Sequence, residues 1–540
     1  MKRTGFSLAV RLMLVITLFM FSVPGMVQAV DQDDLMKKID ALSKELSNLK
    51  QQMQDMQKKD AAKEEKMAAV EKKADEAKEA AGPSWLEIGG DFRTRYDYLT
   101  GKTHDAVVLD TFSPTFGSPS VAQTQKNTSL LTNRLGLNIK ARATEDIQVK
   151  ARLLMYKVWG HETSQPVTGP NNAFFADKQS VFDGNVTHTP SDNALRVDAA
   201  YATWSNIAGQ PIWFSIGRRP STGGIPTNIR MNTEKIGTAG VPGLLIDYAF
   251  DGGTIGVAPD IAVLPGAYAK FCYGKGFDSG FRNSANSMKD VNFAGINVVP
   301  YDTDNLHLEF QVSRAFDIFA FPESGSVTFA TPFNPLTGSS SITFPNSNLG
   351  NITQYGTVVM GKIDNLGPGD LNLFLSAAAS HTSPNGNTFG NTPFNYGLMW
   401  DASTGQHSRS GYGAYLGARY DIKSTGTKLG LEYNHGSKYW ITFTPASDDM
   451  WTSKLGTRGN VYEAYVIQEL NKKPIAKRGK AFFRLGYQYY DFQYTGSNNW
   501  VGAPQKIADL SSVQGPSTVP QFFPVLKHAQ DVYLTFDVMF

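Results

Sequence analysis

Histidine, cysteine and acidic residues are the groups of this 540-residue chain that could support catalysis or hold a metal. An enzyme needs a base and a nucleophile within reach of one another. None of the eight histidines belongs to a recognisable pattern with serine, cysteine or metal ligands, and the pair His307 and Glu309 is explained more simply as polar residues on a wet wall. The single cysteine, Cys272, excludes an internal disulfide and covalent haem attachment. The sequence therefore predicts no catalytic site, no metal and no cofactor.

Charged residues at alternate positions are the stronger chemical signal. In segments 86–98, 134–143 and 147–153 they alternate with apolar residues, and a period of two is typical of a strand with two different faces. Buried unpaired charge costs on the order of several kcal/mol per group, so the charged face must be in contact with water. We expect the following basic residues to line this wet interior: Arg93, Arg95, Arg134, Lys140, Arg142, Lys150, Arg152 and Arg196.

The apolar face of the same strands is expected to contact lipid. Unsatisfied backbone edges are so costly in lipid that a sheet there has to close into a barrel. The C-terminal strand has the clearest pattern, because alternate positions are apolar up to the last residue. A terminal phenylalanine resembles the signal that outer-membrane barrels present to their assembly machinery. The residues of this assembly signal are Val532, Leu534, Phe536, Val538 and Phe540.

Sixteen segments have strand-like patterns, so the sequence predicts an all-β fold, a transmembrane antiparallel barrel of 16 to 18 strands. Brief connections, among them 145–146, 251–253 and 423–427, alternate with extended ones, as periplasmic turns and outer loops do in such barrels. Region 259–290 could hold a further hairpin. The expected strands are 85–98, 130–143, 147–158, 194–204, 211–218, 244–250, 254–258, 291–300, 305–316, 354–363, 370–380, 411–421, 428–436, 460–470, 480–492 and 530–540.

The composition fits such a barrel. The chain has 50 glycines and a high content of aromatic residues (8 Trp, 22 Tyr and 33 Phe), while hydrophobic residues make up 41%. Many turns, together with aromatic girdles at the two membrane interfaces, account for these values. The formal net charge of +2 provides no electrostatic footprint for a nucleic-acid partner.

The N-terminal part of the chain differs from the rest. Lys2 and Arg3 precede an apolar run that ends in small residues, so residues 1–29 are expected to be a signal peptide. Residues 30–82 are expected to form a periplasmic coiled-coil stalk, because apolar positions there are spaced alternately by four and three. A lone solvated helix is the alternative. The barrel is expected over residues 84–540. The seam of the stalk is Leu35, Ile39, Leu42, Leu46, Leu49, Met53 and Met56.

As an architecture, residues 31–540 resemble the diffusion-porin class of outer-membrane proteins, and more closely those porins, phosphate-selective ones included, that carry a coiled coil before the barrel. Local support comes from 196–201, 213–220 and 247–250, which look like porin strand ends. In general porins the loop after the fifth strand folds inward and narrows the pore. By position, the resemblance implies a constriction, and rings of charge there select ions by sign. The constriction residues would be Arg218, Arg219, Arg230, Glu234 and Lys235.

The resemblance implies an outer-membrane channel for passive or weakly selective diffusion of small hydrophilic solutes or ions, surrounded by lipid and without enzymatic activity. The charged wall has a slight basic excess, and pairing across the pore that neutralises it is favoured over true anion preference. Two alternatives stay open: a sheath for a partner cytochrome or lipoprotein, and a cell-wall tether whose stalk holds peptidoglycan or a periplasmic partner. The seam predicts a homo-oligomer, and a trimer is favoured, although Leu and Met at these positions do not fix whether two or three helices associate.

Overall fold

A computed structural model describes residues 85–109, 117–160, 188–190, 192–284, 286–319, 326–334 and 339–345 (these two by their backbone), 347–388, 396–401, 404–444, 448–470, 474–476, 479–502, 504–515, 518–521 and 524–540. The predicted signal peptide and stalk lie outside these residues and stay predictions. Trp85–Phe540 form one structural unit.

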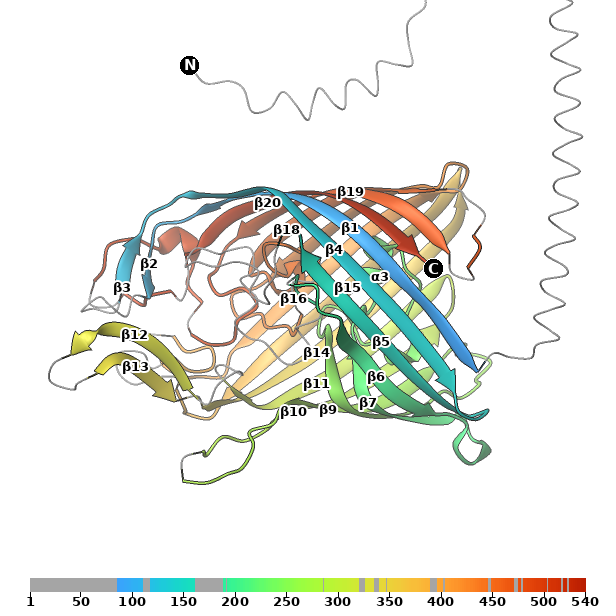
Figure 1. The fold of residues 1–540 in the computed structure, drawn as a ribbon, viewed down its shortest axis with the longest axis horizontal. Helices are drawn as coiled ribbons and strands as arrows, with labels where there is room; N and C mark the ends of the chain where they lie inside the picture. Colours follow the sequence, from blue (N-terminus) through green and yellow to red (C-terminus); the bar gives the residue numbers. More distant parts are fainter. Residues whose placement is uncertain are drawn as a thin grey trace, which may run out of the picture. The chain divides into compact units, whose positions relative to one another are not determined.

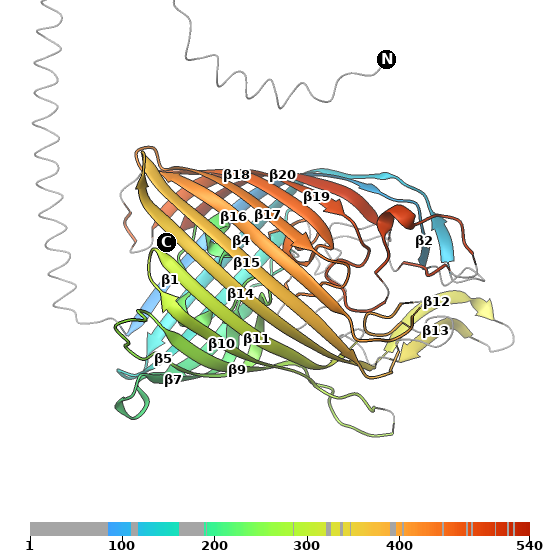
Figure 2. The same cartoon turned by 180° about the vertical axis from the view of Figure 1, so that it is seen from behind.

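Sixteen of the described strands close into an antiparallel barrel (Figures 1 and 2). Strands that are consecutive in the wall pair along the chain, and β1 pairs with β20 to complete the circle. The predicted fold class is thus confirmed. The barrel strands are β1 (Leu86–Thr103), β4 (Thr124–Arg142), β5 (Ile147–Val158), β6 (Arg196–Trp204), β7 (Ile212–Ser221), β8 (Tyr248–Val257), β9 (Tyr268–Phe277), β10 (Val291–Asp302), β11 (Leu306–Phe319), β14 (Asn348–Leu366), β15 (Gly369–Pro384), β16 (Ser410–Ile422), β17 (Thr427–Gly436), β18 (Gly459–Glu469), β19 (Lys480–Phe492) and β20 (Leu526–Met539).

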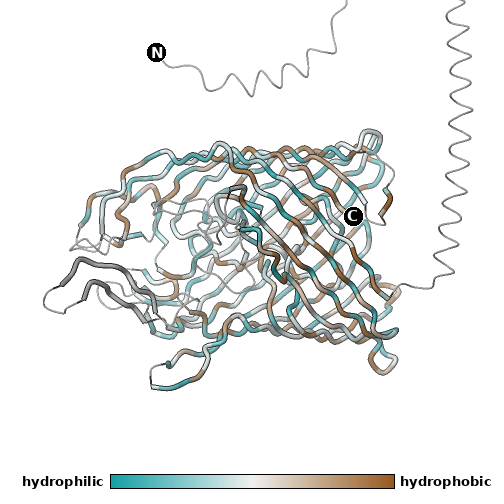
Figure 3. The backbone as a smooth tube through the Cα atoms, viewed as in Figure 1, coloured by the Kyte–Doolittle hydropathy of each residue, from teal (hydrophilic) through white to brown (hydrophobic). Residues whose placement is uncertain are grey.

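Alternation of side chains gives the wall an apolar outer surface and a polar inner one, and Figure 3 shows hydropathy changing from residue to residue along the strands. On β20, Val532 and Leu534 are exposed on the outside, whereas Asp531 and Tyr533 are buried on the inside. The terminal residue seals the seam, because Gly90 donates its N–H to the carbonyl of Phe540 at 2.8 Å and accepts from the amide of Phe540 at 3.0 Å.

Two features of the predicted strand order are wrong. Residues 251–253 are not a turn, because β8 continues through them and Gly252 pairs with both β7 and β9. The sixteenth barrel strand is instead β9, within the region 259–290. Adjacent glycines at 252 and 253 carry no side chains, so the alternation that would have identified one continuous strand is interrupted there.

Small elements complete the described chain. Two hairpins stand apart from the barrel sheet, and one short helix and four 3-10 turns lie in the connections. None of the described helices is long and apolar enough to cross a membrane. These elements are β2 (Ala106–Leu109), β3 (Gly117–Ser120), β12 (Ser326–Asn334), β13 (Ser339–Pro345), α3 (Thr227–Met231), η4 (Ile207–Gly209), η5 (Gly237–Ala239), η6 (Lys454–Gly456) and η7 (Ile507–Asp509).

Candidate functional site

The connection between β7 and β8, residues 222–247, spans the barrel lumen from wall to wall, and we name it the crossing segment. Lys270 Nζ of β9 donates to the carbonyl of Thr238 at 2.7 Å. Arg484 Nη1 of β19 donates to the carbonyl of Arg230 at 2.8 Å. In the closed order of sixteen strands β9 and β19 are eight positions apart, so these two anchors belong to opposite walls.

The crossing segment also reaches the end of the barrel where the short turns lie. Lys235 Nζ donates to the carbonyl of Thr303, at the turn between β10 and β11, over 2.8 Å, and it is paired with Asp302. Asn232 accepts from Lys428 Nζ at 2.8 Å and donates to Glu469 Oε1 at 2.8 Å. The segment is therefore fastened along most of the lumen.

A second segment, the described residues 437–444 and 448–458 between β17 and β18, enters the lumen from the opposite wall, because β17 lies eight positions from β7 in the closed strand order, and we name it the inner loop. Phe443 exchanges backbone hydrogen bonds with the crossing segment: its N–H donates to the carbonyl of Leu245 at 2.9 Å, and its carbonyl accepts from Asp247 N at 2.8 Å. Thr442 Oγ1 donates to the carbonyl of Leu244 at 2.6 Å. The two segments thus form one body inside the barrel.

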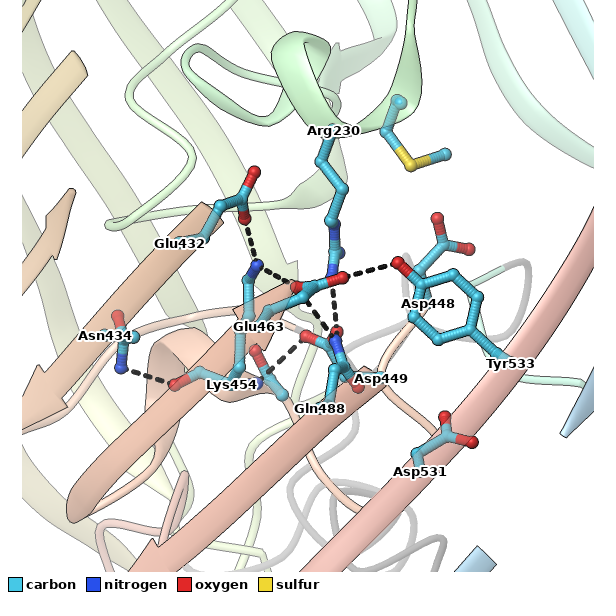
Figure 4. A network of polar contacts seen from close by, with 12 residues as sticks. Arg230, Glu432, Asn434, Asp448, Asp449, Lys454, Glu463, Gln488, Asp531 and Tyr533 are labelled. Carbon is cyan, nitrogen blue, oxygen red and sulfur yellow. Dashed lines mark hydrogen bonds and ion pairs between the residues drawn. The ribbon is translucent and has the colours of Figure 1, made fainter. Parts of the chain in front are cut away.

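An ion network joins this body to the wall (Figure 4). Arg230 Nη1, on α3, lies 2.7 Å from Asp449 Oδ1 of the inner loop and 3.0 Å from Glu463 Oε2 of β18. Lys454 of the inner loop lies 2.6 Å from Glu463 Oε2 and is also paired with Glu432 of β17. All five side chains are buried, so the network holds several charges away from solvent.

Tyrosines from the wall complete this network. Tyr533 donates to Glu463 Oε1 at 2.6 Å, while Tyr415 and Tyr465 donate to the two oxygens of Glu432 at 2.6 Å and 3.1 Å. A buried ion pair is stable only when its remaining lone pairs are satisfied, and removal of one partner costs roughly 3 to 5 kcal/mol. The network therefore fixes the position of the crossing segment.

One side of the lumen is filled by an apolar core. Leu244, Leu245 and Ile246 of the crossing segment and Trp440 and Ile441 of the inner loop are all buried. They pack against the inner face of the neighbouring strands. The wall residues in this contact include Val358, Met360, Phe374 and Tyr415.

The part of β1, β4 and β5 nearest the short turns is polar and keeps contact with solvent, whereas Leu99, Leu130 and Val158 further along these strands are buried in a second apolar cluster with the inner loop. Asp91 lies 2.7 Å from Arg152 Nη2 and 3.6 Å from Arg134 Nε. The exposed fractions of Asp91, Arg134 and Arg152 are 19%, 18% and 24%, and Lys140 reaches 30%. We name this set the polar track, with five basic and two acidic residues: Glu87, Asp91, Arg134, Lys140, Arg142, Lys150 and Arg152.

Three of the eight residues predicted to line the wet interior lie outside the polar track. Arg93 and Arg95 point inward but are only 1% exposed, because the inner loop covers them: Arg93 is paired with Asp448, and Arg95 Nη1 donates to the carbonyl of Asp448 at 2.9 Å. Arg196 is paired with Asp192 at 2.8 Å at the start of β6. The expectation that the whole charged face is wet is therefore wrong for the part that the inner loop covers.

The predicted constriction residues separate into two groups. Arg219 lies inside, over the ring of Tyr201, while Arg230 and Lys235 belong to the crossing segment, as does the exposed Glu234. In the pairing of β7 with β8, Phe214 lies opposite Ile255, and both side chains are exposed on the outer wall. Arg218 lies opposite Asp251 in the same register, four positions further along β7. Alternation puts Arg218 on that outer face. It is therefore not a constriction residue, and the role of the others stays a prediction.

Sequence reasoning missed the inner loop and with it Asp448, Asp449 and Lys454. The available signal was length, because 22 residues separate β17 from β18, more than a short turn needs. The connection 278–290 was likewise not foreseen as a loop. Glu463 was missed because Val461 and Tyr465, on the same inward face of β18, make that face look apolar in the sequence.

Two carboxyl groups in the connections have shifted pKa values. Burial raises the pKa of Asp247 to about 6, and the nearby His188 and a hydrogen bond from Gly223 N only partly oppose this. Burial acts in the same direction on Asp448, but Arg93 and Arg134 more than offset it and hold the pKa of Asp448 well below its ordinary value. Asp448 therefore stays charged in the lumen, whereas Asp247 titrates near neutrality.

The acidic and histidine residues show one further cluster. His307 Nδ1 lies 2.9 Å from Asp302 Oδ1, and Nε2 lies 3.4 Å from Glu309 Oε2. Among the described residues, no group of three histidine, cysteine or acidic side chains is arranged to hold a metal ion.

A closed antiparallel barrel with an apolar outer wall, a polar inner wall and inward-folded connections is the fold of outer-membrane β-barrel proteins. The chain belongs to the family described as "Protein of unknown function (DUF3373)", whose profile matches residues 124–540.

Comparisons with other proteins add the following. No curated protein matches the sequence. Among solved structures, the chain is similar to Salmonella typhi OmpF in complex with daunomycin, with 9% identity, 84% of this chain and 97% of that chain covered, and a TM-score of 0.40. It is also similar to the trimer form of in-vitro folded OmpT, an outer membrane protein of Vibrio cholerae, with 11% identity, coverage of 84% and 99%, and a TM-score of 0.36.

Proposed function

We propose that this protein is a narrow, off-centre channel in the outer membrane for small hydrophilic solutes or ions, without enzymatic activity. The observation that carries the proposal is the division of the lumen. An apolar core and the crossing segment occupy one side, while Asp91, Arg134, Arg152 and Lys140 on the other side keep contact with water. Permeating solutes follow the polar track.

The outer wall supports a membrane location. Leu431, Leu485, Ile296 and Phe310, on separate strands, are 51% to 66% exposed, and a barrel with such a surface is stable only when lipid covers it. The stalk projects into the periplasm in this proposal, and the long connections face outward.

Charge on the track sets the preference among solutes. Five basic residues face two acidic ones, and Asp91 is shared between Arg134 and Arg152. Pairing of this kind neutralises much of the wall, so a weak preference for anions is expected. The sheath alternative is disfavoured, because the crossing segment and the core occupy the centre that a folded partner would need.

Planar-bilayer recording of the purified full chain tests the proposal. We expect stepwise conductance with a weak anion preference, measured as the reversal potential in a salt gradient. Changing Arg134→Gln and Arg152→Gln together should move the preference toward cations. Arg218→Gln is the matched control, because it removes the same kind of charge from the outer wall. Silent membranes with correctly folded protein would overturn the channel, and an equal shift in the control would overturn the polar track as its path.

A further inference from the structure

Asp448 of the inner loop places its carboxylate among three arginines from three strands. Its Oδ1 lies 2.5 Å from Arg93 Nη2 of β1 and 3.7 Å from Arg134 Nη1 of β4. Its Oδ2 lies 3.9 Å from Arg484 Nη2 of β19. A carboxylate carried on a connection thus occupies a cluster of cations that belongs to the wall.

The wall alone does not neutralise this cluster. Among the described residues, Asp448 is the ion-pair partner of both Arg93 and Arg484, whereas Arg134 also has Asp91, 3.6 Å away. Asp537 is opposite Arg93 in the register and accepts from Thr535 at 2.5 Å. Without Asp448, Arg93 and Arg484 would be buried cations that lack an ion-pair partner, which is strongly unfavourable unless another anion enters.

The cluster also has hydrogen-bonding capacity that the protein does not use. Nε and Nη1 of Arg93 and Nε of Arg484 are buried and have no hydrogen-bond partner, although both side chains are only 1% exposed. Most buried donors in proteins are satisfied, and the two oxygens of Asp448 are likewise without a hydrogen bond, so Asp448 pairs with these arginines by charge and leaves donors available to a further acceptor. A guanidinium presents a planar fork that matches the two oxygens of a carboxylate.

We propose that Arg93, Arg134 and Arg484 form a binding site for small carboxylates, and that Asp448 is a tethered competitor that occupies it. The proposal rests on the proposed function, because Arg134 and Asp91 connect the cluster to the polar track. A group tethered to the barrel through a 22-residue connection acts as if it were present at roughly millimolar concentration or more. Asp448 therefore weakens the binding of free carboxylates and prevents them from binding so tightly that they are released slowly.

Equilibrium binding to the full chain in detergent tests the site independently of conduction. The probes are acetate and succinate, and the readout is the thermal unfolding midpoint at constant ionic strength. Asp448→Asn keeps the shape but removes the charge, and we expect at least about tenfold tighter binding of both probes than in the unchanged protein. Asp364→Asn is the control, because it also removes one negative charge, here from an ion pair with Lys362 on β14 at the opposite side of the barrel. It should leave carboxylate binding unchanged.

A second set of variants keeps the test valid if Asp448→Asn folds poorly. Asp448→Glu should fold and keep the weak binding of the unchanged protein. Replacing the partly exposed Arg134 by Gln in the Asp448→Asn background should remove most of the gained affinity. Equal effects in Asp448→Asn and Asp364→Asn would overturn the proposal, because only the overall charge would then matter. Stabilisation of Asp448→Asn by phosphate but not by acetate would overturn the carboxylate assignment. Binding without conductance would overturn the channel and leave the site standing.

Discussion

Arg230 Nη1 lies 2.7 Å from Asp449 Oδ1, and this ion pair joins the two segments that meet inside the barrel. Arg230 belongs to the connection after β7 and Asp449 to the connection after β17, so the pair spans 219 positions of the sequence. The same guanidinium holds Glu463 of the wall. A single side chain therefore fixes both segments to β18.

Arg230→Met should loosen the crossing segment. The substitution removes a cation that pairs with the buried Asp449 and Glu463, and this lowers the free energy of unfolding by roughly 3 to 5 kcal/mol. We expect higher unit conductance and larger current fluctuations in planar bilayers, with the barrel still folded. Arg196→Gln is the control, because its pair with Asp192 lies at the start of β6, away from α3. Identical currents in the two variants would contradict the role of Arg230.

Asp247→Asn should change the pH dependence of stability. Because the folded-state pKa of Asp247 is raised to about 6, the folded state binds the proton more tightly than the unfolded state, and stability falls as pH rises toward and through that value. Asparagine keeps the acceptor for Gly223 N and cannot ionise. Asp247 is partly accessible to solvent, so the variant should be more stable by on the order of 1 kcal/mol at pH about 7.5 and no more stable at pH about 4.

Urea unfolding of the detergent-solubilised barrel at several pH values measures this effect. His188→Gln is a useful companion, because it removes a charge that favours ionised Asp247. It should increase the loss of stability at high pH. A stability difference between Asp247→Asn and the unchanged protein that does not vary with pH would contradict the prediction.

Gly90→Val should impair closure of the barrel. A Cβ at this position would lie 2.4 Å from the carbonyl oxygen of Gly136 on β4 and 2.8 Å from the ring of Phe540, so the pairing of β1 with β4 and the position of Phe540 at the seam would both have to shift. We expect a clear loss of the folded fraction, measured as the heat-modifiable band on a gel. Gly361→Val is the matched control, because a Cβ on β14 meets nothing within 4 Å. Equal folded fractions would contradict this reading of the seam.

Deleting residues 31–81 tests the predicted stalk. If its seam drives self-association, the shortened protein should be monomeric in detergent by light scattering, with unit conductance per barrel unchanged. Replacing Leu42 and Leu46 by Ser in the full chain should have the same effect with less change in length. A loss of envelope integrity in cells without any change in oligomeric state would favour a cell-wall tether instead.

Much of the barrel could be predicted because its signal is local. Val532, Leu534 and Phe540 alternate with Asp531 and Tyr533, and each side chain alone determines which environment it tolerates. The strand order was harder to predict at Gly252, because glycine has no side chain that would show which face of the strand it lies on. The sequence thus determined the two-faced wall and the direction of most of the charged residues, whereas the predicted count of sixteen agrees only because the division of β8 into two strands offsets the missing β9.

Only the tertiary structure decided what fills the lumen. Arg93 and Arg95 have the pattern of wet residues, yet they are buried because Asp448, more than 350 positions away, covers them. Alternation puts the adjacent Arg218 and Arg219 on opposite faces, but the pairing with β8 decides which of them faces the lumen. Alternation follows from the geometry of a single strand, whereas the filling of the interior depends on contacts between distant segments that no local pattern encodes.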